Sequence, residues 1–186
     1  PNAKPPAKPL PSAVCAPPDM HAPLPLHVNG QAMRLDVAPS RLLLEVLREQ
    51  CQLKGTHQGC DTAQCGACTV LVDGAAVKSC NRLAVQCSGQ HITTIEGVAT
   101  SDAELHVMQQ CFSKHHALQC GFCTPGMVMR ALAMVHEDVP AEDQAVRHAL
   151  SGNLCRCTGY EGIVKAVCEG LTLLRAQAST PAQGQV

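Results

Sequence analysis

The chain has 186 residues, with 14 Lys and Arg against 15 Asp and Glu, and its only aromatic residues are one Tyr and two Phe. A formal charge of −1 leaves no face that must be strongly basic, so nucleic acid is not expected as a partner. No stretch approaches the roughly 18 to 20 consecutive apolar residues of a membrane span, and the first residues show no secretory signal. These features predict a cytoplasmic protein with no membrane span.

The two ends of the chain have the composition of extended segments. Residues 1–24 hold eight of the 13 prolines and little periodic apolar pattern, which predicts a Pro-rich extended arm that contains Cys15. Residues 176–186 are rich in Ala, Gln, Ser and Pro, and they predict a flexible tail. The folded part is therefore expected between these ends.

Three segments of the first half have strand patterns. Residues 24–37 alternate apolar and polar side chains about an Asn-Gly dipeptide, and residues 69–80 flank an Asp-Gly dipeptide. Both dipeptides favour the primed turns of tight β-hairpins, so two hairpins are predicted. The β-branched segment 91–97 predicts a last strand.

A single helix is predicted between the two hairpins, over residues 40–51, with Ser40 able to cap its first turn. Its apolar face would carry Leu43, Val46, Leu47 and Cys51. A short helical piece at 82–87 would precede the last strand. Strands wrapped around one helix describe a small ββαββ domain that ends near Gly97.

The apolar period changes to that of helices in the second half. Ser101 and Glu104 have the spacing of a capping box for a helix that runs to about His116. Three more helices are predicted, one opening at Thr124 with Pro at its first position, one over 141–150 and one over 162–175. Four helices of this kind predict a small bundle.

Cysteine makes up 13 of the 186 residues, more than a reducing cytosol leaves without a purpose. Eight of them form two quartets: a first quartet of Cys60, Cys65, Cys68 and Cys80, and a second quartet of Cys120, Cys123, Cys155 and Cys157. Each half of the chain has only about 75 residues, a size at which small domains commonly add metals or disulfides. The quartets therefore predict one inorganic centre in each half. The remaining cysteines of the folded part are interpreted as small buried hydrophobes: Cys51, Cys87, Cys111 and Cys168.

The first quartet has the pattern C-x4-C-x2-C-x11-C, whose opening is the spacing of plant-type [2Fe-2S] ferredoxins. Gly59 and Gly66 would let the loop wrap closely and turn backbone N–H groups toward an anionic cluster. Zinc would more naturally use two C-x2-C knuckles, and this loop contains one. The pattern favours iron-sulfur over zinc, with His57 interpreted as a solvated loop residue and not as a ligand.

The second quartet is a C-x2-C pair, a gap of 31 residues and a C-x-C pair. Each pair lies just ahead of a predicted helix N-terminus, whose partial positive charge suits an anionic cluster. The C-x-C pair cannot place both sulfurs on one side of a regular helix, so it must lie in a loop. An iron-sulfur cluster is favoured, and zinc held by four thiolates stays open. A Rieske centre using His115 and His116 is disfavoured because four cysteines are already present.

Three segments carry the quartets in a characteristic order: GCDTAQCGACTVLVDGAAVKSC, LQCGFCTPGM and SGNLCRCTGY. With their separations they closely resemble the small iron-sulfur subunit of the molybdenum hydroxylases, the family of xanthine dehydrogenase and aerobic carbon monoxide dehydrogenase. The resemblance spans residues 25–175 and implies an α+β fold. It implies a plant-ferredoxin-like β-grasp domain at 25–98 and then a four-helix-bundle domain at 99–175, with one [2Fe-2S] cluster in each. The Pro-rich arm departs from the shorter N-termini of the family.

The resemblance also implies roles and partners. The first quartet would hold a distal cluster, and the second quartet a cluster proximal to the molybdopterin. Gln119 and Cys157 match the family residues that touch the pterin. The implied partners are a large subunit with molybdopterin cytosine dinucleotide and a medium subunit with FAD, or a cytochrome subunit with haem. The implied assembly is a dimer of heterotrimers.

The predicted function is electron transfer within a molybdenum hydroxylase. Electrons would pass from the molybdopterin through two clusters to FAD or a cytochrome, while the complex hydroxylates a small carbonyl, an N-heterocycle or carbon monoxide. The sequence shows no Ser-His-Asp set, carboxylate pair or Gly-rich phosphate loop, so no substrate chemistry is expected on this chain. The alternatives are a free-standing ferredoxin and a zinc-stabilised interaction module. The substrate is not predicted, because the selecting pocket would belong to the large subunit.

Overall fold

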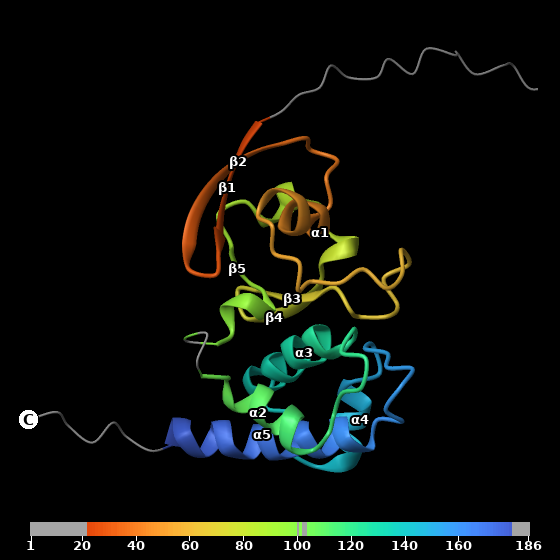
Figure 1. Ribbon diagram of the computed structural model, residues 1–186. Helices are drawn as coiled ribbons and strands as arrows, with labels where there is room; N and C mark the ends of the chain where they lie inside the picture. The colour runs from red at the N-terminus through yellow and green to blue at the C-terminus, as the bar shows by residue number, and fades with distance from the viewer. Residues whose placement is uncertain (1–21, 100, 102–103, 180–186) are drawn as a thin grey trace, which may run out of the picture.

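The computed structural model describes residues 22–99, 101 and 104–179, which form two stacked lobes (Figure 1). The upper lobe of the figure contains the strands, and the lower lobe contains the long helices. Cys15 and most of the predicted arm and tail lie outside the described residues. Regular structure extends beyond both predicted boundaries of the folded part, because the first strand begins at Ala22 and the last helix runs to Ser179.

The upper lobe is built on a sheet whose five described strands are β1 (Ala22–Val28), β2 (Gln31–Val37), β3 (Thr69–Val72), β4 (Ala75–Lys78) and β5 (His91–Thr93). Their order is β2-β1-β5-β3-β4, with β1 and β5 parallel and the other neighbours antiparallel. Both predicted hairpins and the last strand are confirmed. The two-residue turns at Asn29 and Asp73 and the glycines after them all have positive φ, as primed turns of type I′ require.

A helix packs on this sheet and comprises α1 (Leu43–Glu45) and the π-helical η1 (Val46–Gln50). The predicted helix is present, but the prediction that Ser40 caps it is wrong. Leu42 is extended because it pairs with Leu83 in a β-bridge, and its N–H donates to Glu45 Oε2 at 3.0 Å. A long-range pairing therefore sets the first residue of the helix.

The core of the upper lobe lies between this helix and the sheet. Its buried members include Leu26, Val28, Leu43, Leu47, Val70 and Ile92. Three short 3-10 helices complete the lobe: η2 (Ser79–Asn81), η3 (Ala84–Cys87) and η4 (Ile95–Gly97). The helical piece predicted at 82–87 corresponds to η3.

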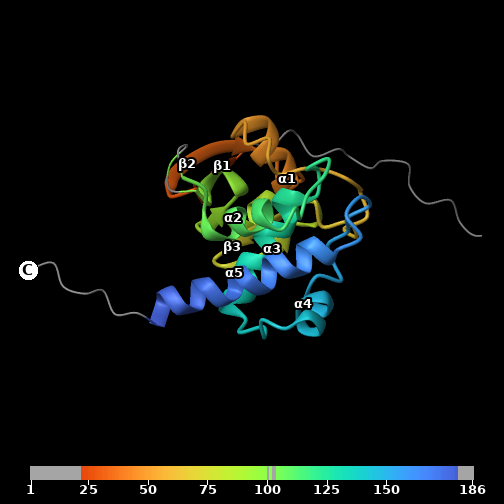
Figure 2. The ribbon, with the colours of Figure 1, turned by 60° about the horizontal axis from the view of Figure 1, so that its bottom comes forward.

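The described part of the lower lobe contains four helices: α2 (Val107–Lys114), α3 (Thr124–His136), α4 (Asp143–Ala149) and α5 (Glu161–Ser179). The longest helix, α5, packs against the other three (Figure 2). Their buried side chains form one apolar core that includes Met108, Phe112, Met127, Ile163 and Leu171. The four predicted helices are therefore present in the predicted order.

Two details of these helix starts differ from the prediction. Ser101 and Glu104 pair in an isolated β-bridge and do not form the capping box of α2. That helix starts after His106, whose Nδ1 accepts from Met108 N–H at 3.2 Å, while Gln109 Oε1 accepts from His106 N–H at 2.9 Å. The buried stripe of α2 begins at Met108, so packing fixes the start. In α3, Pro125 is the second residue and not the first.

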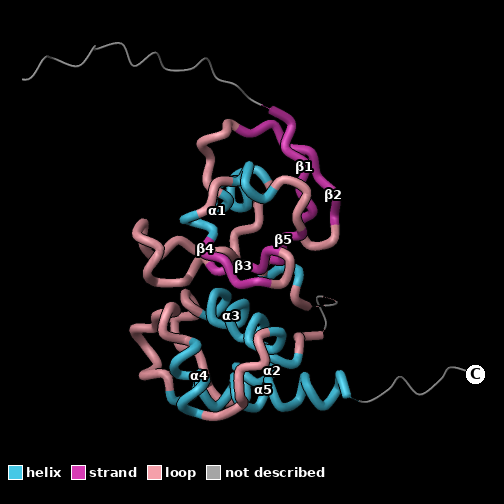
Figure 3. Tube along the Cα trace, turned by 180° about the vertical axis from the view of Figure 1, so that it is seen from behind, coloured by secondary structure: helices cyan, strands magenta, loops and turns pink. Residues whose placement is uncertain are grey.

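The lobes meet along α3, which lies directly against β3 and β4 (Figure 3). Leu71 of β3 forms an apolar cluster with Met129 and Ala133 of α3. Gly126 lets the first turn of α3 approach the first cysteine loop, since a Cβ there would collide with Gly66 O. The helix α3 thus brings the two halves of the chain into close contact.

The isolated cysteines lie mostly in these cores. Cys87 and Cys111 are buried, as predicted, and Cys51 and Cys168 pack against the two cores while keeping partial exposure. Within residues 22–99, 101 and 104–179, no helix has both the length and the apolar character needed to cross a bilayer.

Candidate metal centres

The first quartet lies on one continuous stretch of the upper lobe. Cys60 and Cys65 lie in the irregular loop before β3, Cys68 directly precedes β3, and Cys80 lies in η2 after β4. The β3-β4 hairpin explains the gap of 11 residues between the last two cysteines, because it returns the chain to its starting point. Ser79 Oγ donates to Cys68 O at 2.8 Å and ties the two ends of the hairpin.

Backbone N–H groups of this loop point at its first thiol. The N–H of Cys65 lies 3.4 Å from Cys60 Sγ. Together with the N–H of Thr62, it lowers the pKa of Cys60 to about 6. Burial, with the neighbouring Cys68 thiol, raises the pKa of Cys80 to about 12. Cys80 therefore needs a nearby metal cation to become a thiolate at neutral pH.

The two glycines of this loop are required by close approach. A Cβ at Gly59 would lie 3.2 Å from Cys65 Sγ. Gly66 has φ +72°, and a Cβ there would lie 2.5 Å from Gly152 O. A side chain at either position would push into the space beside the sulfurs or into the opposite loop, which fits the role predicted for both glycines.

The second quartet is assembled from two separate loops. Cys120 and Cys123 precede α3, with Cys123 at its N-cap, and Cys155 and Cys157 lie in the loop between α4 and α5. Cys157 Sγ lies 3.6 Å from Cys120 Sγ. The predicted loop conformation of the C-x-C pair and the position of Cys123 at a helix N-terminus are both confirmed.

The inner thiols of the second quartet have shifted pKa values. Burial, with the Cys155 and Cys120 thiols, raises the pKa of Cys123 to about 12, and the N–H of Cys123 itself partly opposes this. Burial raises the pKa of Cys155, but the hydroxyl and N–H of Thr158, the N–H of Cys157 and the Cys123 thiol together outweigh it and lower the pKa. Thr158 Oγ1 lies 3.2 Å from Cys155 Sγ. The loop therefore stabilises negative charge on this sulfur.

Each quartet consists of two neighbouring pairs of sulfurs. The interacting pairs are Cys60 with Cys65, Cys68 with Cys80, Cys120 with Cys157, and Cys123 with Cys155. In the described ranges, no three His, Cys, Asp or Glu side chains converge on a single metal ion. A [2Fe-2S] cluster with four cysteine ligands takes two thiolates on each iron. Two pairs of sulfurs with N–H groups directed at them fit that group.

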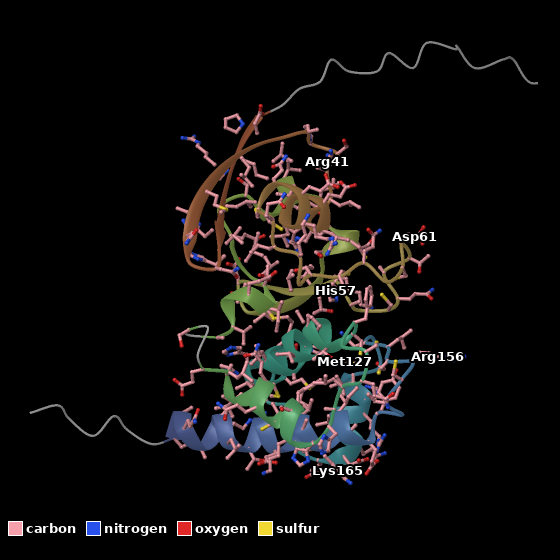
Figure 4. All side chains as sticks on the ribbon, viewed as in Figure 1. Arg41, His57, Asp61, Met127, Arg156 and Lys165 are labelled. Atoms are coloured by element: carbon pink, nitrogen blue, oxygen red, sulfur yellow. The ribbon has the colours of Figure 1, made fainter. Side chains whose placement is uncertain are left out.

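The two cysteine loops are joined by hydrogen bonds. Leu154 N–H donates to Cys65 O at 2.8 Å, so the residue before Cys155 bonds to a residue of the first quartet. Asn153 is buried, and its Nδ2 lies 3.0 Å from Gly66 O and 3.1 Å from Gly126 O. Figure 4 shows both loops on one side of the molecule, where Asp61 marks the first and Arg156 the second.

His57 also connects the two loops, although the sequence suggested a solvated residue. Its Nδ1 lies 2.8 Å from Phe122 O, and its ring stacks on Phe122 with centroids 4.7 Å apart and an angle of 18°. The label of His57 in Figure 4 lies at the level where the lobes meet. The interpretation of His57 as a purely solvated loop residue is therefore wrong.

Two other residues considered in the sequence, His115 and Gln119, have surroundings that bear on their predicted roles. His115 bonds to Glu169 of α5, which also pairs with Lys114 at 2.6 Å. This partner turns His115 toward α5, so nothing in its contacts favours a Rieske centre. Gln119 is exposed and directly precedes Cys120, so its side chain is free to face a partner.

Sequence reasoning missed several residues that hold the loops. Lys78 Nζ donates to Ala63 O at 2.7 Å, and Tyr160 Oη accepts from Cys155 N–H at 2.8 Å. Asn153, whose Nδ2 bonds to Gly66 O and Gly126 O, is a third such residue. A possible signal was that Tyr160 is the chain's single Tyr and follows the C-x-C pair so closely.

Two family models match the chain. A "2Fe-2S iron-sulfur cluster binding domain" matches residues 26–91, and a "[2Fe-2S] binding domain" matches residues 94–168. Each match contains one complete quartet. The two models together therefore support iron-sulfur clusters as the groups that this chain binds.

Two bacterial iron-sulfur or dehydrogenase subunits are similar in sequence to this chain over most of their own length. The chain is 48% identical over 147 residues to the 6-hydroxypseudooxynicotine dehydrogenase complex subunit beta of Paenarthrobacter nicotinovorans, covering 78% of this chain and 91% of that protein. It is 46% identical over 144 residues to the xanthine dehydrogenase iron-sulfur-binding subunit of Escherichia coli O157:H7, covering 76% and 89%.

Among solved structures, a chain of quinoline 2-oxidoreductase from Pseudomonas putida 86 matches with a TM-score of 0.80 and 41% identity. The match covers 86% of this chain and 98% of that chain. These similarities indicate a subunit of a multisubunit oxidoreductase, the electron-transfer part of an enzyme, and not a free ferredoxin. The chain belongs to the family of iron-sulfur subunits of xanthine dehydrogenase and related molybdenum hydroxylases.

Proposed function

We propose that the chain holds one [2Fe-2S] cluster on each quartet, in a ferredoxin-like β-grasp domain at 25–98 and a helical-bundle domain at 99–175. The clusters would pass electrons one at a time from a molybdopterin cytosine dinucleotide on a large subunit to FAD or haem on another subunit. The observation that carries this proposal is the arrangement of each quartet as two sulfur pairs. Zinc would instead need its thiolates gathered around one point.

The surface around the second quartet supports a large subunit at that end. Cys120 and Cys157 are exposed. Two exposed apolar side chains, Phe122 at 46% and Leu154 at 52%, line the same hollow as these cysteines, and Leu118, at 40%, precedes Cys120 by two positions. Exposed apolar residues that gather at one place mark a protein interface. We therefore assign the second quartet to the pterin side, with Gln119 and Cys157 as the residues that reach the pterin.

The first quartet has a different surface. Asp61, Thr62 and Gln64 are exposed around Cys60, so the rim there is polar. A polar rim is typical of electron-transfer contacts that are smaller and weaker than obligate ones. This supports the first quartet as the distal centre that faces a flavin or cytochrome subunit.

The chain itself supplies a bonded connection between the two centres. Cys65 belongs to the first quartet, and its carbonyl oxygen accepts from Leu154, whose next residue is Cys155. Gly59, Gly66 and Gly126 keep the two loops this close because each lacks a side chain. The residues between the quartets would hold the two loops at this spacing.

The names of relatives suggest the substrate class. They include caffeine dehydrogenase, nicotine 6-hydroxylase and nicotinate dehydrogenase subunits, all named for N-heterocyclic compounds. We propose an N-heterocycle as the substrate of the complex, ahead of a small aldehyde, which the similarity to aldehyde oxidoreductase PaoA would suggest. The selecting pocket would lie on the large subunit. A cytoplasmic location and a dimer of heterotrimers stay predictions.

The test uses the purified complex. We expect about four irons per small chain and two distinct [2Fe-2S] signals by electron paramagnetic resonance after full reduction. Cys60→Ser should remove or alter one signal and leave the other. Cys51→Ser is the matched control, because Cys51 lies outside both quartets and should change neither. Zinc in place of iron, or a single signal in the unaltered complex, would reject the proposal.

A further inference from the structure

One side chain crosses from the first cysteine loop to the second. His57 precedes Cys60 by three positions, and Phe122 lies between Cys120 and Cys123. A carbonyl oxygen can only accept a hydrogen bond, so the 2.8 Å contact means that His57 Nδ1 carries its proton and donates to Phe122 O. The ring stack of these two residues is a second and independent contact.

The position of this hydrogen bond matters for the second centre. The carbonyl of Phe122 and the N–H of Cys123 belong to the same peptide group. Burial raises the pKa of the Cys123 thiol overall, and this N–H opposes the rise, so it favours the thiolate. A donor on the carbonyl polarises the whole peptide group, because linked hydrogen bonds strengthen one another. His57 thus increases the positive charge that the N–H presents to a ligand sulfur.

Hydrogen bonds to cluster sulfurs influence the reduction potential. Reduction adds negative charge to the cluster, and N–H groups directed at its sulfurs stabilise that charge. Stronger donors therefore make reduction more favourable. In this chain His57 of the first cysteine loop strengthens the Cys123 N–H of the second. The reduction potential of the second centre therefore depends on where the first loop lies.

Phe122 is held in place by the same loop. A Cβ at Gly59 would lie 3.2 Å from Phe122 Cε1, so the glycine leaves just enough space for the ring. The ring of His57 covers one face of Phe122 while the rest of that side chain stays exposed. The stack therefore keeps the Phe122 carbonyl within reach of Nδ1.

We infer that His57 is a positioning residue for electron transfer, which holds the Cys120-Cys123 loop against the first loop and makes the second centre easier to reduce. This inference rests on the proposed function, since it requires a cluster on each quartet. It assigns a role in tuning the relay to a residue that is not a ligand.

The test is a redox titration of the intact complex, followed by the electron paramagnetic resonance signals of both clusters. His57→Phe keeps a ring for stacking but removes the donor. We expect it to lower the equilibrium constant for reduction of the second centre by roughly 1.3- to fourfold, which corresponds to about 10–30% of the worth of a hydrogen bond to a charged group. The first centre should shift less. His57→Gln keeps an N–H donor without the ring and should remain closer to the unaltered complex.

A matched control comes from another pair of stacked rings in the described part of the chain. His91 stacks on His27 with centroids 4.6 Å apart, in the sheet and not in a cysteine loop. His91→Ala should leave both potentials unchanged. Equal shifts of the two centres in His57→Phe, no shift at all, or equal effects of the Phe and Gln variants would overturn the inference. In those cases the two signals and the iron content stay normal, so the proposed function survives; their loss from the unaltered complex would reject the proposed function instead.

Discussion

The two cysteine loops reach similar ligand sets by different routes. The first quartet is closed by local structure: the β3-β4 hairpin, the N–H groups of the loop, and Lys78 Nζ, which donates to Ala63 O. The second quartet joins segments separated by 31 residues, and helices hold it together. Arg130 of α3, for example, donates to Ala149 O at 3.1 Å, at the end of α4. The first centre can therefore form from nearby residues, whereas the second requires a packed helical core.

The loops also differ in what surrounds them. The exposed residues beside Cys60 are polar, whereas those beside the second quartet include Phe122 and Leu154 as well as the polar Gln119 and Arg156. Between the two loops lies a contact region, here called the seam, which consists of Gly66, Gly126, Asn153 and Leu154 and their hydrogen bonds. The seam belongs to both loops. The comparison teaches that each centre has its own support, while the distance between them depends on a few residues of the seam. Changes in the seam should therefore affect both centres, and changes in one support should affect one.

The largest effect is expected from Gly66→Ala. Its Cβ would lie 2.5 Å from Gly152 O and 2.6 Å from Asn153 Nδ2, at φ +72°. Overpacking and the left-handed backbone together should lower the free energy of unfolding by about 3 kcal/mol or more. Both centres should lose iron, because the seam opens. Denaturant unfolding and iron analysis measure this.

The matched control is Gly74→Ala in the β3-β4 turn. Gly74 also has positive φ, at +84°, but a Cβ there would meet nothing within 4 Å. We expect a loss of about 1–2 kcal/mol from backbone strain alone, with normal iron content. If the two variants lost equal stability, the close approach at Gly66 would not be what matters.

The next effect is expected from Asn153→Ala. Its Nδ2 lies within 3.2 Å of Gly66 O, Thr69 Oγ1 and Gly126 O, and the residue is only 4% exposed. The alanine would remove the one donor that these acceptors share, although Gly66 O keeps the N–H and hydroxyl of Thr69 as donors. The lost hydrogen bonds and the cavity should together cost about 2 kcal/mol. Faster transfer of iron from both centres to a chelator would show that the seam has loosened. Gln144→Ala, on the exposed face of α4, should change nothing measurable.

The parts of the fold that follow from short sequence distances could be predicted. The Asn-Gly and Asp-Gly dipeptides predict both hairpins because their residues readily adopt the positive φ angles that a type I′ turn requires. The cysteine spacing identified both quartets, since a ligand set needs its residues at defined separations. The helix over 124–136 could be located because Pro and small residues open it.

The contacts between the two loops could not be predicted, because they join residues far apart in the sequence. His57 and Phe122 are 65 positions apart, and Asn153 and Gly66 are 87 apart. The predictions that Ser40 and Ser101 cap helices were wrong for the same reason, because contacts between distant residues set where these helices begin. Local capping chemistry was present at both, but the β-bridge of Leu42 and the burial of Met108 decided where the helices begin.

A smaller effect, confined to one centre, is expected from Lys78→Met. The methionine keeps the apolar stem but removes the donor to Ala63 O, so the first loop should lose about 1 kcal/mol of support. Iron should leave the first centre faster, and the second centre should be unchanged. Arg130→Met is the opposite test, since it removes the donor to Ala149 O. If either variant affected both centres equally, the two supports would not be separate.

The smallest effect concerns pH and the support of the second loop. Glu137 holds Arg130 through hydrogen bonds of 2.5 and 2.8 Å, and the Arg130 guanidinium lowers the pKa of Glu137. Because the folded-state pKa lies below the unfolded value of about 4.3, this stabilisation is complete above that pH and is lost as the pH falls through the folded-state pKa.

The Glu137 side chain is 43% exposed, so screening limits the contribution to about 0.5 kcal/mol. Glu137→Gln should therefore unfold more easily than the unaltered complex at pH 7, and the two should converge once the pH falls below the folded-state pKa of Glu137. Other carboxylates are present in both proteins, so a difference that persisted in acid would mean that Glu137 acts through its shape and not its charge. A difference that disappears with acid would link proton binding to the helical support of the second centre, because Glu137 acts on Arg130, which bonds to the end of α4.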